Sequence, residues 1–229
     1  MYDLFKGLYR KKCTILLGFP RFVDKTLYQC DRQKTCTDRD LHMTTERRDF
    51  LKGGAAGTLA FTCGGTTLML TPRQAHARGI PLTVLNDGEA AILAAFGDTL
   101  VPGAAKSGVV NFVDQQLGTS PHDALLLARM LGVEPPYRNF YRSGLAAINE
   151  LAYAIHDKGF AQLDVDAGEA LAGSMLETNP PQWPNGAPPA PFVYTLFRSD
   201  AVDVVYGTIE GFAALGVPYM AHILPPEPW

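Results

Sequence analysis

The feature that most constrains this chain is an ordered series of short patterns between residues 45 and 77. Its basic head consists of Arg47, Arg48, Phe50, Leu51 and Lys52. The 18 residues from Gly53 to Leu70 follow, of which half are apolar and five are glycine. A small-x-small triplet, Ala75-His76-Ala77, ends the series. If the chain is cut there, 77 of the 229 residues are removed and 152 remain, which is the size of one domain.

This series resembles a twin-arginine export signal, which directs folded proteins across the bacterial inner membrane. We therefore expect residues 43–77 to be a signal peptide that is cleaved after Ala77, with Ala75 and Ala77 as the small residues of the site. A permanent membrane anchor is one alternative, but it needs about 20 predominantly apolar residues and tolerates few glycines. A basic patch beside a mobile glycine-rich linker is the other.

Residues 1–42 fit no export signal. They carry nine basic and five acidic residues, and their apolar runs are too short to span a membrane. We expect Met43 to be the true start and residues 1–42 to be a disordered upstream extension. The alternative is a basic arm that contacts nucleic acid.

Charge and cysteine are divided unequally at Ala77. The first 77 residues hold 13 of the 20 Lys and Arg and 7 of the 23 Asp and Glu, so the part after Ala77 has a net charge of −9. This acidity argues against nucleic acid as a partner. All four cysteines also precede Ala77, so a cleaved protein would have no disulfide, thiol nucleophile or cysteine-ligated cluster.

The remaining 152 residues read as an all-α fold, with five or six helices in one compact domain and an irregular C-terminal quarter rich in Pro, Gly and aromatic residues. Caps and apolar periodicity predict these helices. They run from Asp87 to before Pro102, from a Ser107 cap to Gly118, from Ser120 to Leu131, from Tyr137 to Lys158 with a break or kink near Gly144, from Val165 to Met175, and from Phe192 to Tyr206.

Four stretches resemble a known family. They are the twin-arginine leader, Leu85–Gly103 followed by Val109–Asp114, the turn Gly159–Leu163, and the aromatic end from Tyr206 to Trp229. Together they are similar to gluconate 2-dehydrogenase subunit 3, the small subunit of flavin-dependent gluconate, glucose and fructose dehydrogenases. The C-terminal part departs from the family by its shorter glycine-rich stretch.

The resemblance implies a non-catalytic subunit, residues 78–229, with no cofactor of its own. FAD and the chemistry would belong to a large flavoprotein dehydrogenase subunit, and a cytochrome c subunit can be a further partner. The signal would engage the twin-arginine translocase, export the folded pair to the periplasm and so serve both chains. Stabilisation of the catalytic subunit is the second role that the resemblance implies.

The residues themselves indicate little independent chemistry. His122, His156 and His222 have no partner at metal-ligand spacing, and no nucleophile elbow or phosphate loop occurs after Ala77. The carboxylate pairs Asp164/Asp166 and Asp200/Asp203 are interpreted as helix caps. A stand-alone exported binding protein and an independent enzyme remain the alternatives.

Aromatic residues and prolines are dense in the C-terminal quarter. Aromatic side chains are common anchors of protein interfaces, and we predict a partner surface that includes Trp183, Arg198, Tyr206, Tyr219 and Trp229. The alternative is that these aromatic side chains cover the domain's own core.

Overall fold

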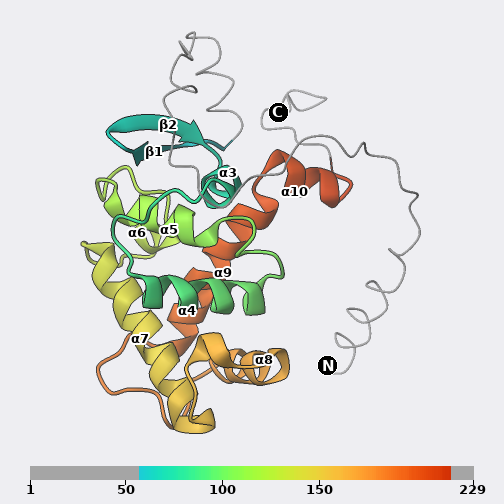
Figure 1. Cartoon of the computed structure of the whole chain (residues 1–229). Coiled ribbons are helices and arrows are strands. Elements are labelled where there is room, and N and C mark those ends of the chain that lie inside the picture. Colours follow the sequence, from blue (N-terminus) through green and yellow to red (C-terminus); the bar gives the residue numbers. More distant parts are fainter. Residues whose placement is uncertain (1–56, 218–229) are drawn as a thin grey trace, which may run out of the picture. The chain divides into compact units, whose positions relative to one another are not determined.

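The computed structural model describes residues 57–217, which form eight α-helices, a short 3-10 helix and a β-hairpin (Figure 1). The elements are β1 (Leu59–Cys63), β2 (Thr66–Leu70), α3 (Pro72–Ala77), α4 (Asp87–Leu100), α5 (Val109–Gly118), α6 (Leu127–Met130), α7 (Tyr137–His156), η2 (Phe160–Gln162), α8 (Val165–Ser174), α9 (Ala190–Tyr206) and α10 (Ile209–Ala214). The all-α prediction is confirmed, and five of these helices have ten or more residues.

Helix α9 is the element around which the others pack. It contacts α4, α5, α6 and α10, and Figure 1 shows it running through the helical body. Its buried positions include Val193, Leu196, Phe197 and Val204. Because these recur at spacings of three and four, they form one continuous apolar stripe along the helix.

Aromatic rings join the longest helices at the centre of the core. Phe96 of α4 meets Phe160 and Phe197 edge-to-face, with ring centroids 5.2 Å and 6.0 Å apart, and Tyr141 of α7 stacks on Phe197 at 5.1 Å. Such pairs stabilise a fold by about 0.5–1.5 kcal/mol beyond their burial. Phe197 therefore connects α4, α7 and α9.

The predicted kink at Gly144 is wrong, because α7 is one helix of 20 residues. A Cβ at Gly144 would lie 3.2 Å from Val193 Cγ1 and 3.3 Å from Phe197 Cζ. The missing side chain lets α7 approach α9 closely.

The cap predicted at Asp164 is confirmed, and the cap predicted at Ser107 is wrong. Asn86 caps α4 in a capping box with Glu89, and the Asp164 side chain accepts a hydrogen bond from the Ala167 amide at the start of α8. Ser107 does not cap α5: the N-cap is Gly108, with φ 86°, and the Ser107 hydroxyl is used elsewhere.

The predicted helix from Ser120 to Leu131 forms only over α6. Residues 124–126 have no regular secondary structure, with Ala124 and Leu126 buried and Leu125 exposed between them. The Leu125 amide donates to Gln116 Oε1 at 2.5 Å rather than to a carbonyl one turn earlier. Burial of Ala124 and Leu126 and this hydrogen bond therefore stabilise a non-helical backbone before α6.

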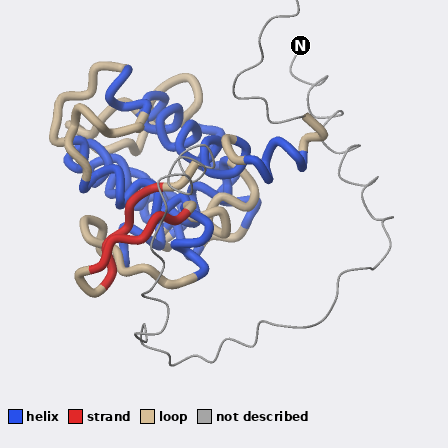
Figure 2. The backbone as a smooth tube through the Cα atoms, turned by 90° about the horizontal axis from the view of Figure 1, so that it is seen from above, coloured by secondary structure: helices blue, strands red, loops and turns tan. Residues whose placement is uncertain are grey.

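The β-hairpin was not predicted. Strands β1 and β2 pair antiparallel, with Cys63 opposite Thr66, and Gly64 and Gly65 have φ of 57° and 81°. Two left-handed residues are typical of the tight hairpin turn, and glycine adopts them without strain. Figure 2 shows the hairpin in red at one face of the helical body.

Buried apolar side chains form two separate clusters. The small cluster consists of Phe61, Leu70, Ala75 and Ile80 from the hairpin, α3 and the following turn. The main core takes its buried side chains from Leu85 to Val204, and Leu59 is the partly buried residue that packs against both clusters. Within the described part of the chain, residues 57–84 therefore contribute no buried side chain to the helical core.

Candidate functional site

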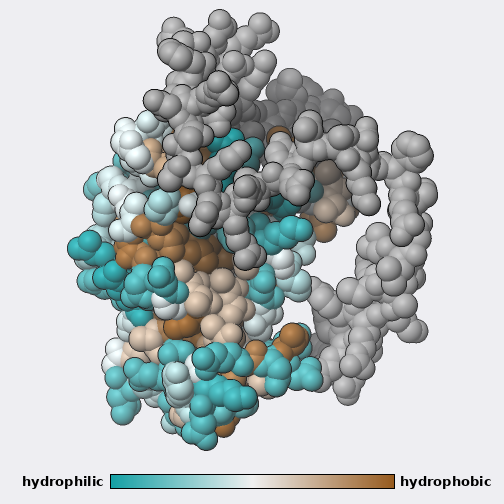
Figure 3. All heavy atoms as spheres, viewed as in Figure 1, coloured by the Kyte–Doolittle hydropathy of each residue, from teal (hydrophilic) through white to brown (hydrophobic). Residues whose placement is uncertain are grey.

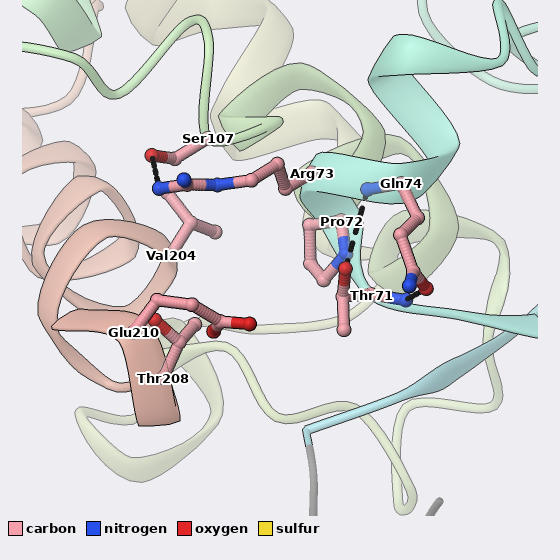
Figure 4. A pocket seen from close by; sticks show the side chains of 8 residues that line it. All are labelled: Thr71, Pro72, Arg73, Gln74, Ser107, Val204, Thr208 and Glu210. Atoms are coloured by element: carbon pink, nitrogen blue, oxygen red, sulfur yellow. Dashed lines mark hydrogen bonds between the residues drawn. The ribbon is translucent and has the colours of Figure 1, made fainter. Parts of the chain in front are cut away.

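A cavity of about 240 Å³ lies where α3, the start of α5, the end of α9 and the start of α10 meet. Its lining residues are Thr71, Pro72, Arg73, Gln74, Ser107, Val204, Thr208 and Glu210 (Figure 4). Half of this set belongs to the predicted signal peptide and half to the helical domain. The cavity therefore lies between the predicted signal peptide and the helical domain. Its lining has one positively charged side chain, Arg73, and one carboxylate, Glu210.

Helix α3 is short but fully capped. The Thr71 hydroxyl accepts from the Gln74 amide and the Gln74 side chain accepts from the Thr71 amide, which is a capping box. At the other end, Gly79 has φ 62°, its amide donates to the His76 carbonyl, and the Ile80 amide donates to the Ala75 carbonyl. This pattern is a Schellman motif, which satisfies the last carbonyls of the helix.

Two contacts fasten α3 to the start of α5, and burial of Ala75 adds to them. Arg73 Nη2 donates to Ser107 Oγ at 3.1 Å, and Figure 4 shows the guanidinium extending toward that hydroxyl. The Pro72 carbonyl approaches Gly108 so closely that a Cβ there would lie 2.1 Å from its oxygen. Ala75, the first small residue of the predicted cleavage site, is completely buried.

A second buried polar group is Asp200, in the interior of α9. Tyr141 Oη donates to Asp200 Oδ2 at 2.5 Å, and Asp200 Oδ1 is buried with no hydrogen-bond partner. Burial raises the pKa of Asp200 to about 8, against the lowering effect of the Tyr141 hydrogen bond, and the nearby Asp203 raises it further. Burial, followed by the Asp200 charge, raises the pKa of Tyr141 well above its usual value. The carboxyl is therefore neutral at pH 7.

The interpretation of Asp200 and Asp203 as helix caps is wrong. Helix α9 begins at Ala190, ten residues earlier, because Pro189 and Pro191 fit its first turn. Asp203 is exposed near the end of α9, and burial of part of its carboxyl raises its pKa.

A second buried carboxylate, Asp114 of α5, organises the segment that leads into α4. Its two oxygens accept from the Thr83, Val84 and Leu85 amides, each at 2.8 Å, and from the Thr83 hydroxyl at 3.1 Å. Four donors fully satisfy the carboxylate. Asp114 is therefore structural, and it fixes the chain between the predicted signal peptide and the domain.

The predicted interface residues are dispersed. Trp183 is buried, and its indole N–H donates to the Pro188 carbonyl at 2.9 Å, so it belongs to the domain's own core. Arg198 is exposed on α9, and Tyr206 is half-buried against the core at the end of that helix. Tyr219 and Trp229 lie outside the described residues, as do the export-signal residues Arg47, Arg48, Phe50, Leu51 and Lys52.

Six of the exposed large apolar side chains among the described residues lie at two places, around α6 and around α10. Around α6, Leu125 is 62% exposed and Met130 75%, with Leu131 also exposed. Around α10, the exposed side chains are Ile209, Leu215 and Val217. Figure 3 shows apolar atoms gathered over the region of α5 and α6, framed by polar ones. Helical periodicity could not reveal the exposed residues near α6, because they are apolar like those of the core.

The described residues contain neither a metal-binding cluster nor a membrane-spanning helix. Within residues 57–217, His, Cys, Asp and Glu side chains do not gather in any group of three or more that could bind a metal ion. Over the same residues, no helix combines the length and the apolar character that a membrane span requires. His122 is exposed and His156 is half-buried, while His222 lies beyond the described part.

The structure defines a small helical domain with a separately clustered N-terminal hairpin and helix, and with apolar side chains exposed around α6 and α10. Exposed large apolar side chains of this kind are common at protein–protein interfaces. Residues 87–220 match the family model described as gluconate 2-dehydrogenase subunit 3, which covers more than half of the chain. The chain belongs to this family and is thus a small subunit of a dehydrogenase complex. No curated protein and no solved structure matches it.

Proposed function

We propose that the chain is the non-catalytic small subunit of a periplasmic, flavin-dependent dehydrogenase for sugars, alcohols or acids. It supplies the twin-arginine signal for a large flavoprotein subunit that carries FAD, and it stabilises that subunit after export. A cytochrome c subunit that accepts the electrons is a further partner in this proposal.

The observation that carries the proposal is the separation of the two apolar clusters. A removable export signal must leave the domain's packing intact when it is lost. The small cluster is built from residues 61–80, whereas the buried side chains of the main core begin at Leu85. Cleavage after Ala77 therefore removes most of the small cluster and no buried residue of the main core.

The exposed apolar residues around α6 and α10 support the partner role. Large apolar side chains that are more than half exposed, such as Leu125 and Met130, lower the free energy when an interface buries them, by about 25 cal/mol per Å². The acidic charge of the part after Ala77 keeps this domain away from nucleic acid.

The proposal is tested by co-export. The double change Arg47→Lys and Arg48→Lys keeps the charge and alters only the arginine pair. We expect it to retain both this chain and its flavoprotein subunit in the cytoplasm, as fractionation and flavin absorbance would report. The matched control is Arg138→Lys, an exposed residue of α7, which should leave both proteins in the periplasm. Export of the flavoprotein despite retention of this chain would contradict the proposal.

A further inference from the structure

The peptide bond predicted to be cut, Ala77–Arg78, lies at the end of a folded helix. The Arg78 amide donates to the Gln74 carbonyl at 3.0 Å, so the nitrogen of this bond is held in the last turn of α3. The Ala75 side chain, two residues before the bond, is completely buried. A peptidase reads its substrate as an extended strand through backbone hydrogen bonds. It cannot do so while these groups are engaged.

The helix is held in this state from both ends and from one side. The capping box at Thr71 and the Schellman motif at Gly79 close the two ends. The side is held by the Arg73–Ser107 hydrogen bond and by the close contact of the Pro72 carbonyl with Gly108. Because the last two contacts come from the helical domain, the domain itself protects the bond.

The small apolar cluster adds a further link between the hairpin and the helix. Ala75 and Ile80 pack with Phe61 and Leu70 of the hairpin, and Gln115 Nε2 of α5 donates to the Ala60 carbonyl at 3.3 Å. Undocking of α3 therefore also disturbs the hairpin. The hairpin and α3 open together as one local unit, whereas the main core does not depend on them.

We propose that α3 is a latch that protects the Ala77–Arg78 bond, so that proteolytic processing requires α3 to undock from α5. This inference rests on the export role proposed above. Before translocation, the folded precursor resists the signal peptidase. When the leader is drawn into the membrane, α3 and the hairpin leave the domain, and the bond becomes an extended substrate. Processing is thereby confined to chains whose leader has been pulled away.

The test compares cleavage of the folded 229-residue precursor with cleavage of a peptide of residues 57–85, using purified bacterial signal peptidase in detergent micelles. The peptide lacks α5 and represents the unprotected bond. We expect the precursor to be cut at least ~10-fold more slowly, since opening of a local unit that costs about 1.4 kcal/mol lowers the open fraction tenfold.

Two variants loosen the latch from different sides. Ser107→Ala removes the acceptor of Arg73 and leaves the peptidase recognition sequence unchanged, so precursor cleavage should rise about threefold to tenfold, as expected for one lost hydrogen bond. Gly79→Ala strains the left-handed end of α3, and its rate is divided by that of the matching peptide. The control is Ser174→Ala on α8, which Figure 1 places at the opposite end of the domain. Unchanged melting temperatures exclude a general loss of folding.

Hydrogen exchange gives an independent readout of the same opening. The Arg78 and Ile80 amides should exchange faster in both latch variants, in proportion to the faster cleavage. Equal cleavage of precursor and peptide would overturn the latch and leave the export role intact. If neither is cleaved at Ala77, the processing site itself is wrong, and the latch falls with it.

Discussion

Asp200 is the residue whose environment is most unusual, because a fully buried carboxyl has only one partner. Burial raises its pKa in the folded protein to about 8, whereas an unfolded chain has the ordinary value of 3.8. Because the pKa is higher in the folded protein than in the unfolded chain, the contribution of Asp200 to the free energy of unfolding is fully present below about pH 4. It is lost as the pH rises toward 8. Between pH 4 and pH 8 the Asp200 carboxyl stays protonated in the folded protein, whereas it is ionised in the unfolded chain.

We predict that Asp200→Asn makes stability less dependent on pH. In the unmodified chain, the free energy of unfolding should fall between pH 4 and pH 8, by at most about 1.4 kcal/mol per pH unit from this one group. The Asn variant keeps an oxygen that accepts from Tyr141 and has no proton to lose. It should match or exceed the unmodified chain at pH 8. Urea unfolding at pH 5, 6.5 and 8 measures this, with Asp123→Asn, an exposed residue, as the control. Parallel pH profiles for the two chains would contradict the prediction.

Asp114 is expected to respond differently from Asp200, because its carboxylate accepts four hydrogen bonds and stabilises the fold in its charged form. Asp114→Ala leaves the amides of Thr83, Val84 and Leu85 without their acceptor. We expect a loss of about 2–4 kcal/mol in the free energy of unfolding, since each buried donor left unsatisfied costs about 1–3 kcal/mol and water reaches part of this segment. Chemical denaturation measures the loss. The same change at exposed Asp123 should shift stability by less than about 0.5 kcal/mol.

At the scale of elements, helix termini were predictable because caps are local. Asn86 with Glu89, and Asp164 with the Ala167 amide, use side chains within three residues of the groups they satisfy. The failures occurred where a distant residue decides the local structure. Gln116 takes the Leu125 amide out of a helix, and the close approach of the Pro72 carbonyl leaves room only for glycine at position 108, which caps α5 in place of Ser107.

The hairpin is an intermediate case. Its signal was present in the sequence as Gly64-Gly65 flanked by short runs rich in Thr and apolar residues. The same residues also fit a signal peptide, and that interpretation does not predict a hairpin. Nothing local indicates that Tyr141 faces Asp200, since the two residues are 59 positions apart and become neighbours only when α7 packs on α9.

The α7–α9 contact yields a prediction with a matched pair of glycines. Gly144→Ala introduces a methyl group 3.2 Å from Val193 and 3.3 Å from Phe197, both completely buried. We expect a loss of about 1–3 kcal/mol from overpacking, although alanine favours a helix by about 1 kcal/mol. Gly173→Ala on α8 meets nothing within 4 Å and should instead stabilise the chain. Thermal unfolding of both variants measures the difference, and equal effects would contradict close packing at Gly144.

Helix α6 yields a prediction about the partner surface. Met130→Glu should weaken binding of the flavoprotein subunit by about tenfold or more if this residue is buried in the interface. Its stability should be unchanged, because Met130 is already 75% exposed. The matched control is Val165→Glu on α8, since Val165 is 73% exposed. Affinity is measured by titration of the purified subunits, and equal affinities for the two variants would remove α6 from the interface.

At the scale of the whole molecule, the buried apolar side chains of the described residues form two separate clusters. The hairpin and α3 form a small unit around Ala75, and the helical domain forms the larger one around Phe197. The division near residue 80 was predictable from the leader pattern, because that pattern marks the boundary directly. The docking of α3 was not predictable, because it depends on Ser107 and Gly108, which lie about 30 residues further along the chain.

The central claim is that this chain is the small subunit of a flavoprotein dehydrogenase. The most direct test is to capture the chain from the periplasm of its native cells with an antibody and to record the flavin absorbance spectrum of the captured material. The expected result is a large yellow protein in roughly stoichiometric amount, whose oxidation of sugars, alcohols and acids can then be screened. A colourless, stable monomer would contradict the claim.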